Sequence, residues 1–163
     1  MQQILKNRNT KGTFQGIVLI EIAKIIEKHP ELNFSKITQN ENIGITKNIF
    51  ASLILYSSKD STKKVLFEII SFGKPTNSAD VVDNFRKRLF QFGFSYCVSI
   101  SPTEYTIFNP YIEGVSFHDR YVKVDKIDDI KQRDILFDFY VNNLKTKLLE
   151  MLRFLNQNLH SEL

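Results

Sequence analysis

The sequence predicts an α/β domain built on a mixed central β-sheet that is flanked by helices. The 163 residues contain 42% hydrophobic and 25% charged side chains, which is enough for one domain with a real core. Apolar residues recur at helical spacing in three segments and at strand spacing between them. A helix lies between two groups of strands and makes a crossover, so the sheet should contain parallel as well as antiparallel pairs.

The first half of the chain is expected to form one helix and three strands. Residues 1–12 are polar and are expected to form a flexible N-terminus. Thr13 is the expected N-cap of a helix that ends near Pro30, because proline cannot continue it. Strands are expected at 34–39, 48–57 and 65–72, and the polar turn 58–63 joins the last two as a hairpin.

The second half should hold a crossover helix, further strands and a long final helix. Ser78 caps the second helix, which runs to about Gln91 with acidic residues first and basic residues last, as the helix dipole favours. Strands are expected at 95–101, 104–109 and 115–124, the last at a sheet edge because it carries charges.

From about Ile130 the chain predicts a helix that reaches Leu159. Its apolar seam is formed by Phe137, Val141, Leu144, Leu148, Met151 and Leu155. The expected organisation is therefore a tail over 1–12, an α/β domain over 13–125 and a C-terminal segment over 126–163. That helix is expected to pack on the domain or on a partner subunit, which allows a homodimer.

The composition limits the kinds of site and the cellular location that can be expected. The single cysteine, Cys97, cannot form an internal disulfide and lies in an apolar run, so we expect it in the core. The three histidines lack metal-ligand spacing. The N-terminus lacks the apolar core of a signal peptide and no stretch approaches a membrane span, so we expect a soluble cytoplasmic protein without a membrane partner.

Glu68 is the most informative residue, because it is a lone carboxylate in the apolar stretch Val65–Phe72. The stretch is typical of a strand buried on both faces. A buried charge costs several kcal/mol unless it is paired, protonated or bound to a metal. Glu68 is therefore either a structural acid, paired with a lysine or capped by backbone amides, or part of a present or ancestral metal site.

A helix, three strands, a helix and a strand pair, with a glutamate on the third strand, resemble the PD-(D/E)XK restriction-endonuclease-like superfamily. The resemblance is nearest to the N-terminal nuclease domain of type I restriction enzyme R subunits and covers roughly residues 14–110. It includes Gly73-Lys74-Pro75 after the Glu68 strand. In that superfamily two carboxylates hold a divalent metal, and a lysine two residues after the second one supports the attacking water.

The resemblance implies roles for individual residues. At two of the superfamily's key positions, however, this sequence has residues that cannot perform the usual function. Glu68 matches the third-strand acid, and Glu21 matches an additional acid on the first helix. The second-strand aspartate falls near Asn48, and Ile70 occupies the lysine position. An active site would therefore hold Mg²⁺ with Glu68, Glu21 and Asn48, and Lys74 would stand in for the missing lysine as a catalytic residue.

The net charge of +4 permits nucleic-acid binding. The candidate phosphate-contacting residues are Lys47, Lys63, Lys64, Arg86, Lys87 and Arg88. We expect a nuclease-related domain with a degraded metal site that binds DNA or assembles with partners in restriction or processing. The alternatives are an active Mg²⁺-dependent deoxyribonuclease with a displaced lysine, and an interaction module that dimerises through its C-terminal helix without touching nucleic acid.

Overall fold

The structure, a computed structural model, describes residues 10–89 and 92–160. Its helices are α2 (Thr10–Lys28), α3 (Ala79–Leu89) and α4 (Asp138–Leu159). Its strands are β1 (Phe34–Asn42), β2 (Phe50–Ser57), β3 (Lys64–Ile69), β4 (Tyr96–Ile100), β5 (Glu104–Phe108) and β6 (Tyr121–Lys126). Three single turns of 3-10 helix, η1 (Pro30–Leu32), η2 (Phe117–Asp119) and η3 (Gln132–Asp134), lie between them.

The six strands form one mixed sheet in the order β1-β2-β3-β4-β5-β6. β3 and β4 are parallel, and every other neighbouring pair is antiparallel. The parallel pair follows from α3, because a strand that runs in the same direction needs a crossover connection. The predicted mixed α/β sheet is thus confirmed, with β6 at an edge as expected.

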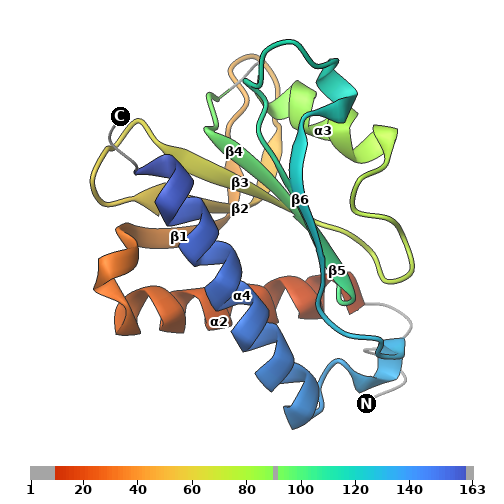
Figure 1. The fold of residues 1–163 in the computed structure, drawn as a ribbon. Coiled ribbons are helices and arrows are strands. Elements are labelled where there is room, and N and C mark those ends of the chain that lie inside the picture. The colour runs from red at the N-terminus through yellow and green to blue at the C-terminus, as the bar shows by residue number, and fades with distance from the viewer. Residues whose placement is uncertain (1–9, 90–91, 161–163) are drawn as a thin grey trace.

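Helices cover both faces of this sheet (Figure 1). α2 and α4 cross each other over one face, and their apolar side chains pack with Leu53, Phe67 and Val98 in the larger core cluster. α3 covers the other face, where Phe85 packs with Leu66 and Cys97 in a second cluster. Alternate residues of β3 therefore enter different cores, which explains why this strand is apolar on both faces.

Two boundaries differ from expectation for identifiable reasons. α2 begins at Thr10, three residues before the expected cap, so residues 10–12 are helical; residues 1–9 lie outside the described residues. β6 begins at Tyr121 rather than at residue 115, because the preceding residues form a loop and η2. Arg120 stabilises that loop through its guanidinium, which donates to the carbonyls of Pro110 and Val115.

α4 starts at Asp138 and not near Ile130, since Ile127 and Ile130 pack into the core as non-helical chain. Phe137 is consequently 49% exposed, and the buried row begins instead with Tyr140, whose hydroxyl donates to the Pro102 carbonyl at 2.7 Å. From Leu144 on, the predicted seam is buried within the chain itself. The expected homodimer would have to use another surface of α4. No helix in the described part of the chain is long and apolar enough to cross a membrane.

Candidate functional site around Glu68

Glu68 lies near the end of β3 on the face that α3 covers, and only 7% of the residue is exposed. Leu66 belongs to the core on that face, and strand alternation places Glu68 on the same side. Its Oε1 is 3.7 Å from Nη2 of Arg88. Its Oε2 is buried and has no hydrogen-bond partner among the described residues. Half of this carboxylate is therefore left without a direct polar contact.

The electrostatic environment disfavours the charged form of this acid. Burial raises the pKa of Glu68 above its usual range, while the positive charges of Arg88 and Lys11 act in the opposite direction. Arg88 is also engaged elsewhere, because its Nε donates to the Phe50 carbonyl at 3.1 Å and its Nη1 to the Asn84 carbonyl at 3.3 Å. Burial, and then the charge of Glu68, raise the pKa of the Cys97 thiol, which agrees with a packing role for this cysteine.

Polar side chains extend from Glu68 across the neighbouring strands. Ser99 is its partner on β4, and Thr106 is the partner of Ser99 on β5. The Ser99 hydroxyl donates to the carbonyl of Thr76, and the hydroxyls of Thr76 and Thr106 are 2.8 Å apart. All three neighbours are buried but hydrogen-bonded. The sequence gives a signal for two of them, because Ser99 and Thr106 each interrupt an apolar stretch, whereas Thr76 lies in a polar turn.

Extending the β2–β3 register by one residue brings Ser52, and not Asn48, to the position across from Glu68. Leu53 pairs with Phe67 in antiparallel register, so the next step places Ser52 beside Glu68. Asn48 lies in the exposed loop before β2, and its Oδ1 accepts a hydrogen bond from Asn42 at 2.8 Å. Sequence reasoning misplaced this position because strand register depends on pairing across the sheet.

Glu21 is also remote from Glu68. It lies on α2, over the opposite face of the sheet, and its carboxylate oxygens are 3.8 Å from the amines of Lys24 and Lys145. Lys11, whose charge acts on Glu68, is ten residues earlier on the same helix. Those ten residues correspond to about 15 Å of helix.

The side chain of α2 that does reach β2 is Gln15, whose Nε2 donates to the Ser52 carbonyl at 3.3 Å. Ile70 packs in the core beside α3, and Lys74 is exposed in the turn after β3. The cation that contacts Glu68 is therefore Arg88 and not Lys74. No group of three metal-ligating side chains is found within the described residues. The expected ligand set of Glu68, Glu21 and Asn48 is not brought together.

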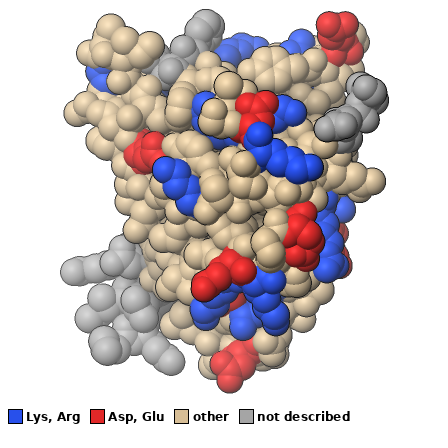
Figure 2. All heavy atoms as spheres, turned by 90° about the vertical axis from the view of Figure 1, so that its left-hand side faces the viewer, with Lys and Arg blue, Asp and Glu red and all other residues tan. Residues whose placement is uncertain are grey.

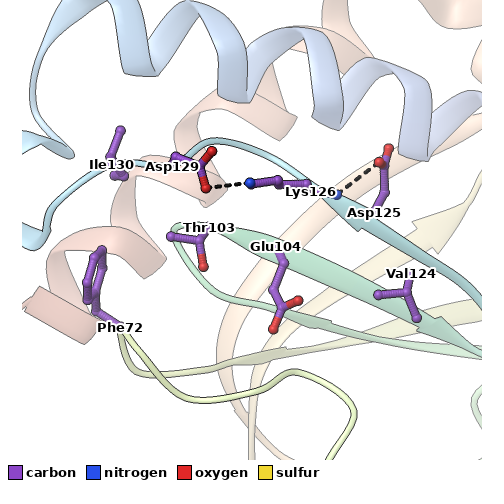
Figure 3. A pocket seen from close by; sticks show the side chains of 8 residues that line it. All are labelled: Phe72, Thr103, Glu104, Val124, Asp125, Lys126, Asp129 and Ile130. Atoms are coloured by element: carbon purple, nitrogen blue, oxygen red, sulfur yellow. Dashed lines mark hydrogen bonds and ion pairs between the residues drawn. The ribbon is translucent and has the colours of Figure 1, made fainter.

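A cavity of about 610 Å³ lies elsewhere, where β5 and β6 meet the chain that leads to α4 (Figure 3). Its carboxylates already have partners. Asp129 pairs with Lys126, and Asp125 accepts from the Lys126 backbone at 2.9 Å and from Lys147 at 3.2 Å. Glu104 accepts from the Thr76 amide at 3.3 Å. We assign this acidic hollow no role in a metal site.

Comparison with known proteins agrees with this architecture. No protein-family model matches the chain, and no curated protein matches it significantly in sequence. A solved structure, that of the type IIG restriction endonuclease BpuSI, superposes with a TM-score of 0.65 at 10% identity over 89% of this chain. The chain has a restriction-endonuclease-like fold.

The matched region is 17% of the BpuSI chain, so the chain spans a small part of that protein's length. At this identity the likeness shows the fold alone. A restriction-endonuclease-like fold places Glu68 on the third strand of a mixed sheet, as the sequence predicted.

The predicted phosphate-contacting residues separate into two groups. Arg86, Lys87 and Arg88 lie on α3. Lys47 lies in the loop before β2, whose Ile43 and Ile49 pack in the same core cluster as α3. Lys64 belongs to the same side, since its amine lies 4.1 Å from the ring centroid of Phe92, which packs in the α3 cluster.

Lys63 lies apart in the β2–β3 turn, where its amine donates to the Leu159 carbonyl at 2.7 Å. Figure 2 shows the face of the molecule that carries β1, where lysines, arginines and acidic residues are interspersed. Most of the predicted set therefore lies on the α3 side, which is the face of the sheet that α3 covers and that also carries Glu68.

Proposed function

We propose that this domain is a nuclease-related, nucleic-acid-binding module whose metal site has lost its chemistry. The observation that carries the proposal is the set of residues around Glu68. The register places Ser52 across from it on β2, Gln15 of α2 donates to the Ser52 carbonyl and Ile70 lies two residues after it, so the positions expected to hold the second acid and the lysine are neutral. Metal-assisted hydrolysis needs a second anionic ligand and a group that supports the attacking water, and among the described residues neither a second carboxylate nor a lysine contacts Glu68.

The lysine and arginine side chains on the α3 side support binding to the DNA backbone. Lys47 and Lys87 are exposed, and neither side chain makes an ion pair or hydrogen bond within the described residues. Such lysines release counterions when they contact phosphates, so binding should weaken steeply with salt and depend little on sequence. The proposed context is DNA restriction or processing, which rests on the restriction-endonuclease-like fold.

The cleavage test compares wild type with Glu68→Ala on plasmid DNA in Mg²⁺ or Mn²⁺. We expect no cleavage above the level of the variant. Cleavage that disappears in Glu68→Ala would instead identify an active endonuclease.

The binding test measures fluorescence anisotropy of labelled DNA over a series of salt concentrations. The Lys47→Ala/Lys87→Ala double variant should lower the slope of log K against log salt by about 2, one for each lost phosphate contact. Lys28→Ala/Lys145→Ala removes the same charge from the α2–α4 side and should leave the slope unchanged. An equal loss in both pairs, or no binding at low salt, would reject the α3 side as the interface.

A second candidate, assembly with another subunit, is favoured by an apolar patch at the start of α4. Leu136, Phe137 and Phe139 are 44%, 49% and 54% exposed. If this patch forms the homodimer expected of the C-terminal helix, sedimentation should show concentration-dependent association that Phe137→Ser/Phe139→Ser abolishes. A wild type that remains monomeric at high concentration would exclude this route.

A further inference from the structure

Arg86 differs from the other arginines near α3 because its hydrogen-bonding groups are unused. Arg88 is engaged with Glu68 and two carbonyls, and Arg120 is engaged with the carbonyls of its own loop. The Arg86 side chain is exposed, and within the described residues it makes neither a hydrogen bond nor an ion pair. A guanidinium has five N–H donors, and none of those of Arg86 is engaged by another described residue.

The position of Arg86 is nevertheless fixed by an aromatic ring. Its guanidinium carbon lies 4.2 Å from the ring centroid of Phe117 in η2. Phe117 packs edge-on against Phe108 with ring centroids 5.3 Å apart, and Phe108 in turn contacts Phe85 of α3. An arginine stacked in this way is held ready for a partner and loses less conformational freedom on binding.

The surroundings favour a ligand that stacks. Next to η2, the loop closed by Arg120 exposes Tyr111 and Val115, which are 62% and 37% accessible. Figure 1 shows this loop beside α3, at the end of the molecule that also carries the loop before β2. Lys64 lies over Phe92 and Arg88 is paired, which leaves Lys47 and Lys87 beside Arg86 for contacts with phosphates. A duplex presents its bases already stacked and offers mainly phosphates to such a surface, whereas a single strand offers unpaired base faces as well.

We propose that the α3 side binds single-stranded DNA, with Arg86 on Phe117 as a platform on which an unpaired base stacks. One face of the guanidinium contacts the ring of Phe117, and the base would cover the other face. Lys47 and Lys87 would contact flanking phosphates. This inference rests on the proposed nucleic-acid binding and adds the class of nucleic acid and the residue that selects it.

The test measures anisotropy of labelled oligothymidylate of about 20 nucleotides and of a duplex of equal length. The variant is Arg86→Lys, which keeps the charge but removes the planar stacking group. Arg153→Lys is the matched control, because Arg153 is an exposed arginine on α4, on the other side of the sheet. Thermal melts establish that all variants are folded.

We expect wild type to prefer the single strand, and Arg86→Lys to weaken oligothymidylate binding about tenfold with little change in salt slope. Duplex binding and the Arg153→Lys variant should be unaffected. If wild type binds both DNA forms equally and Arg86→Lys matches it, the stacking platform is refuted while the proposed binding function stands. If wild type binds neither DNA, the proposed function itself fails and this inference with it.

Discussion

Oε1 of Glu68 lies 3.7 Å from Nη2 of Arg88, whereas Oε2 of the same carboxylate is buried without a hydrogen-bond partner among the described residues. A buried acid that is half paired costs free energy of folding. The second acid and the lysine that would have given this buried charge a function are replaced by neutral side chains. Glu68 should therefore lower the stability of the folded protein.

Glu68→Gln should stabilise the protein at pH 7 by on the order of 1 kcal/mol, because it removes a poorly solvated charge but keeps the shape. The raised pKa of Glu68 means that the folded state holds this proton at a pH where the unfolded state releases it. The contribution of Glu68 to the free energy of unfolding is thus fully present below pH 4.5, its pKa in the unfolded state. That contribution is lost as the pH rises through the pKa of Glu68 in the folded state.

The advantage of Glu68→Gln should accordingly disappear below about pH 4. Urea unfolding at several pH values measures it, with exposed Glu113→Gln as the control. A loss of stability in Glu68→Gln at pH 7 would mean that the Arg88 contact outweighs desolvation.

Arg88→Met should destabilise the protein by about 2–4 kcal/mol, since it leaves Glu68 without its counter-charge and two carbonyls without their donor. In the Glu68→Gln background the cost should be smaller by about 1 kcal/mol, because no buried charge is then stranded. The double-mutant cycle by urea unfolding gives this coupling. Equal costs in both backgrounds would show that Arg88 acts only through the carbonyls.

Ser52→Asp/Ile70→Lys should create divalent-metal binding that wild type lacks. Register places an aspartate at position 52 beside Glu68, and a lysine at 70 lies two residues on, on the same side. Calorimetric titration with Mn²⁺ checks this, and adding Glu68→Gln should abolish the binding. Heat of binding that survives Glu68→Gln would place the metal elsewhere.

The end of α4 should loosen in mild acid. The Ser57 hydroxyl is 2.6 Å from Nε2 of His160, whose Nδ1 is 2.7 Å from Oδ1 of Asn156. Since the Ser57 oxygen already accepts from the amides of Lys59 and Asp60, it must donate to a neutral imidazole. Burial, with the nearby charges of Lys63 and Lys59, lowers the pKa of His160, and Asp60 opposes this.

A lowered histidine pKa means that the unfolded state binds the proton first as pH falls. Stability should therefore decline as pH drops below the unfolded value of 6.5. Thermal melts between pH 7.5 and pH 5, roughly the range in which histidine titrates, should show a steeper decline in wild type than in His160→Gln. Parallel curves would remove His160 as the cause.

Several features of the fold were predictable because they are encoded locally. The periodicity of Phe14, Val18 and Ile22 indicates a helix, and the unbroken apolar run around Glu68 indicates a doubly buried strand. The start of β6 was not predictable, because the loop and single turn of 3-10 helix before it have a sequence pattern similar to that of a charged edge strand. Phe137 was misassigned to the buried seam because helical spacing alone does not say where α4 starts.

The sequence by itself determined that Glu68 is a buried carboxylate on the third strand of a mixed α/β sheet, and that a lysine is absent two residues later. Only the tertiary structure decided that Ser52 faces it, that Arg88 contacts it and that Glu21 lies over the opposite face. The physical reason is that local spacing sets which side of its own element a residue occupies. Its partners depend instead on strand register and helix docking, which are fixed by packing between segments far apart in the chain.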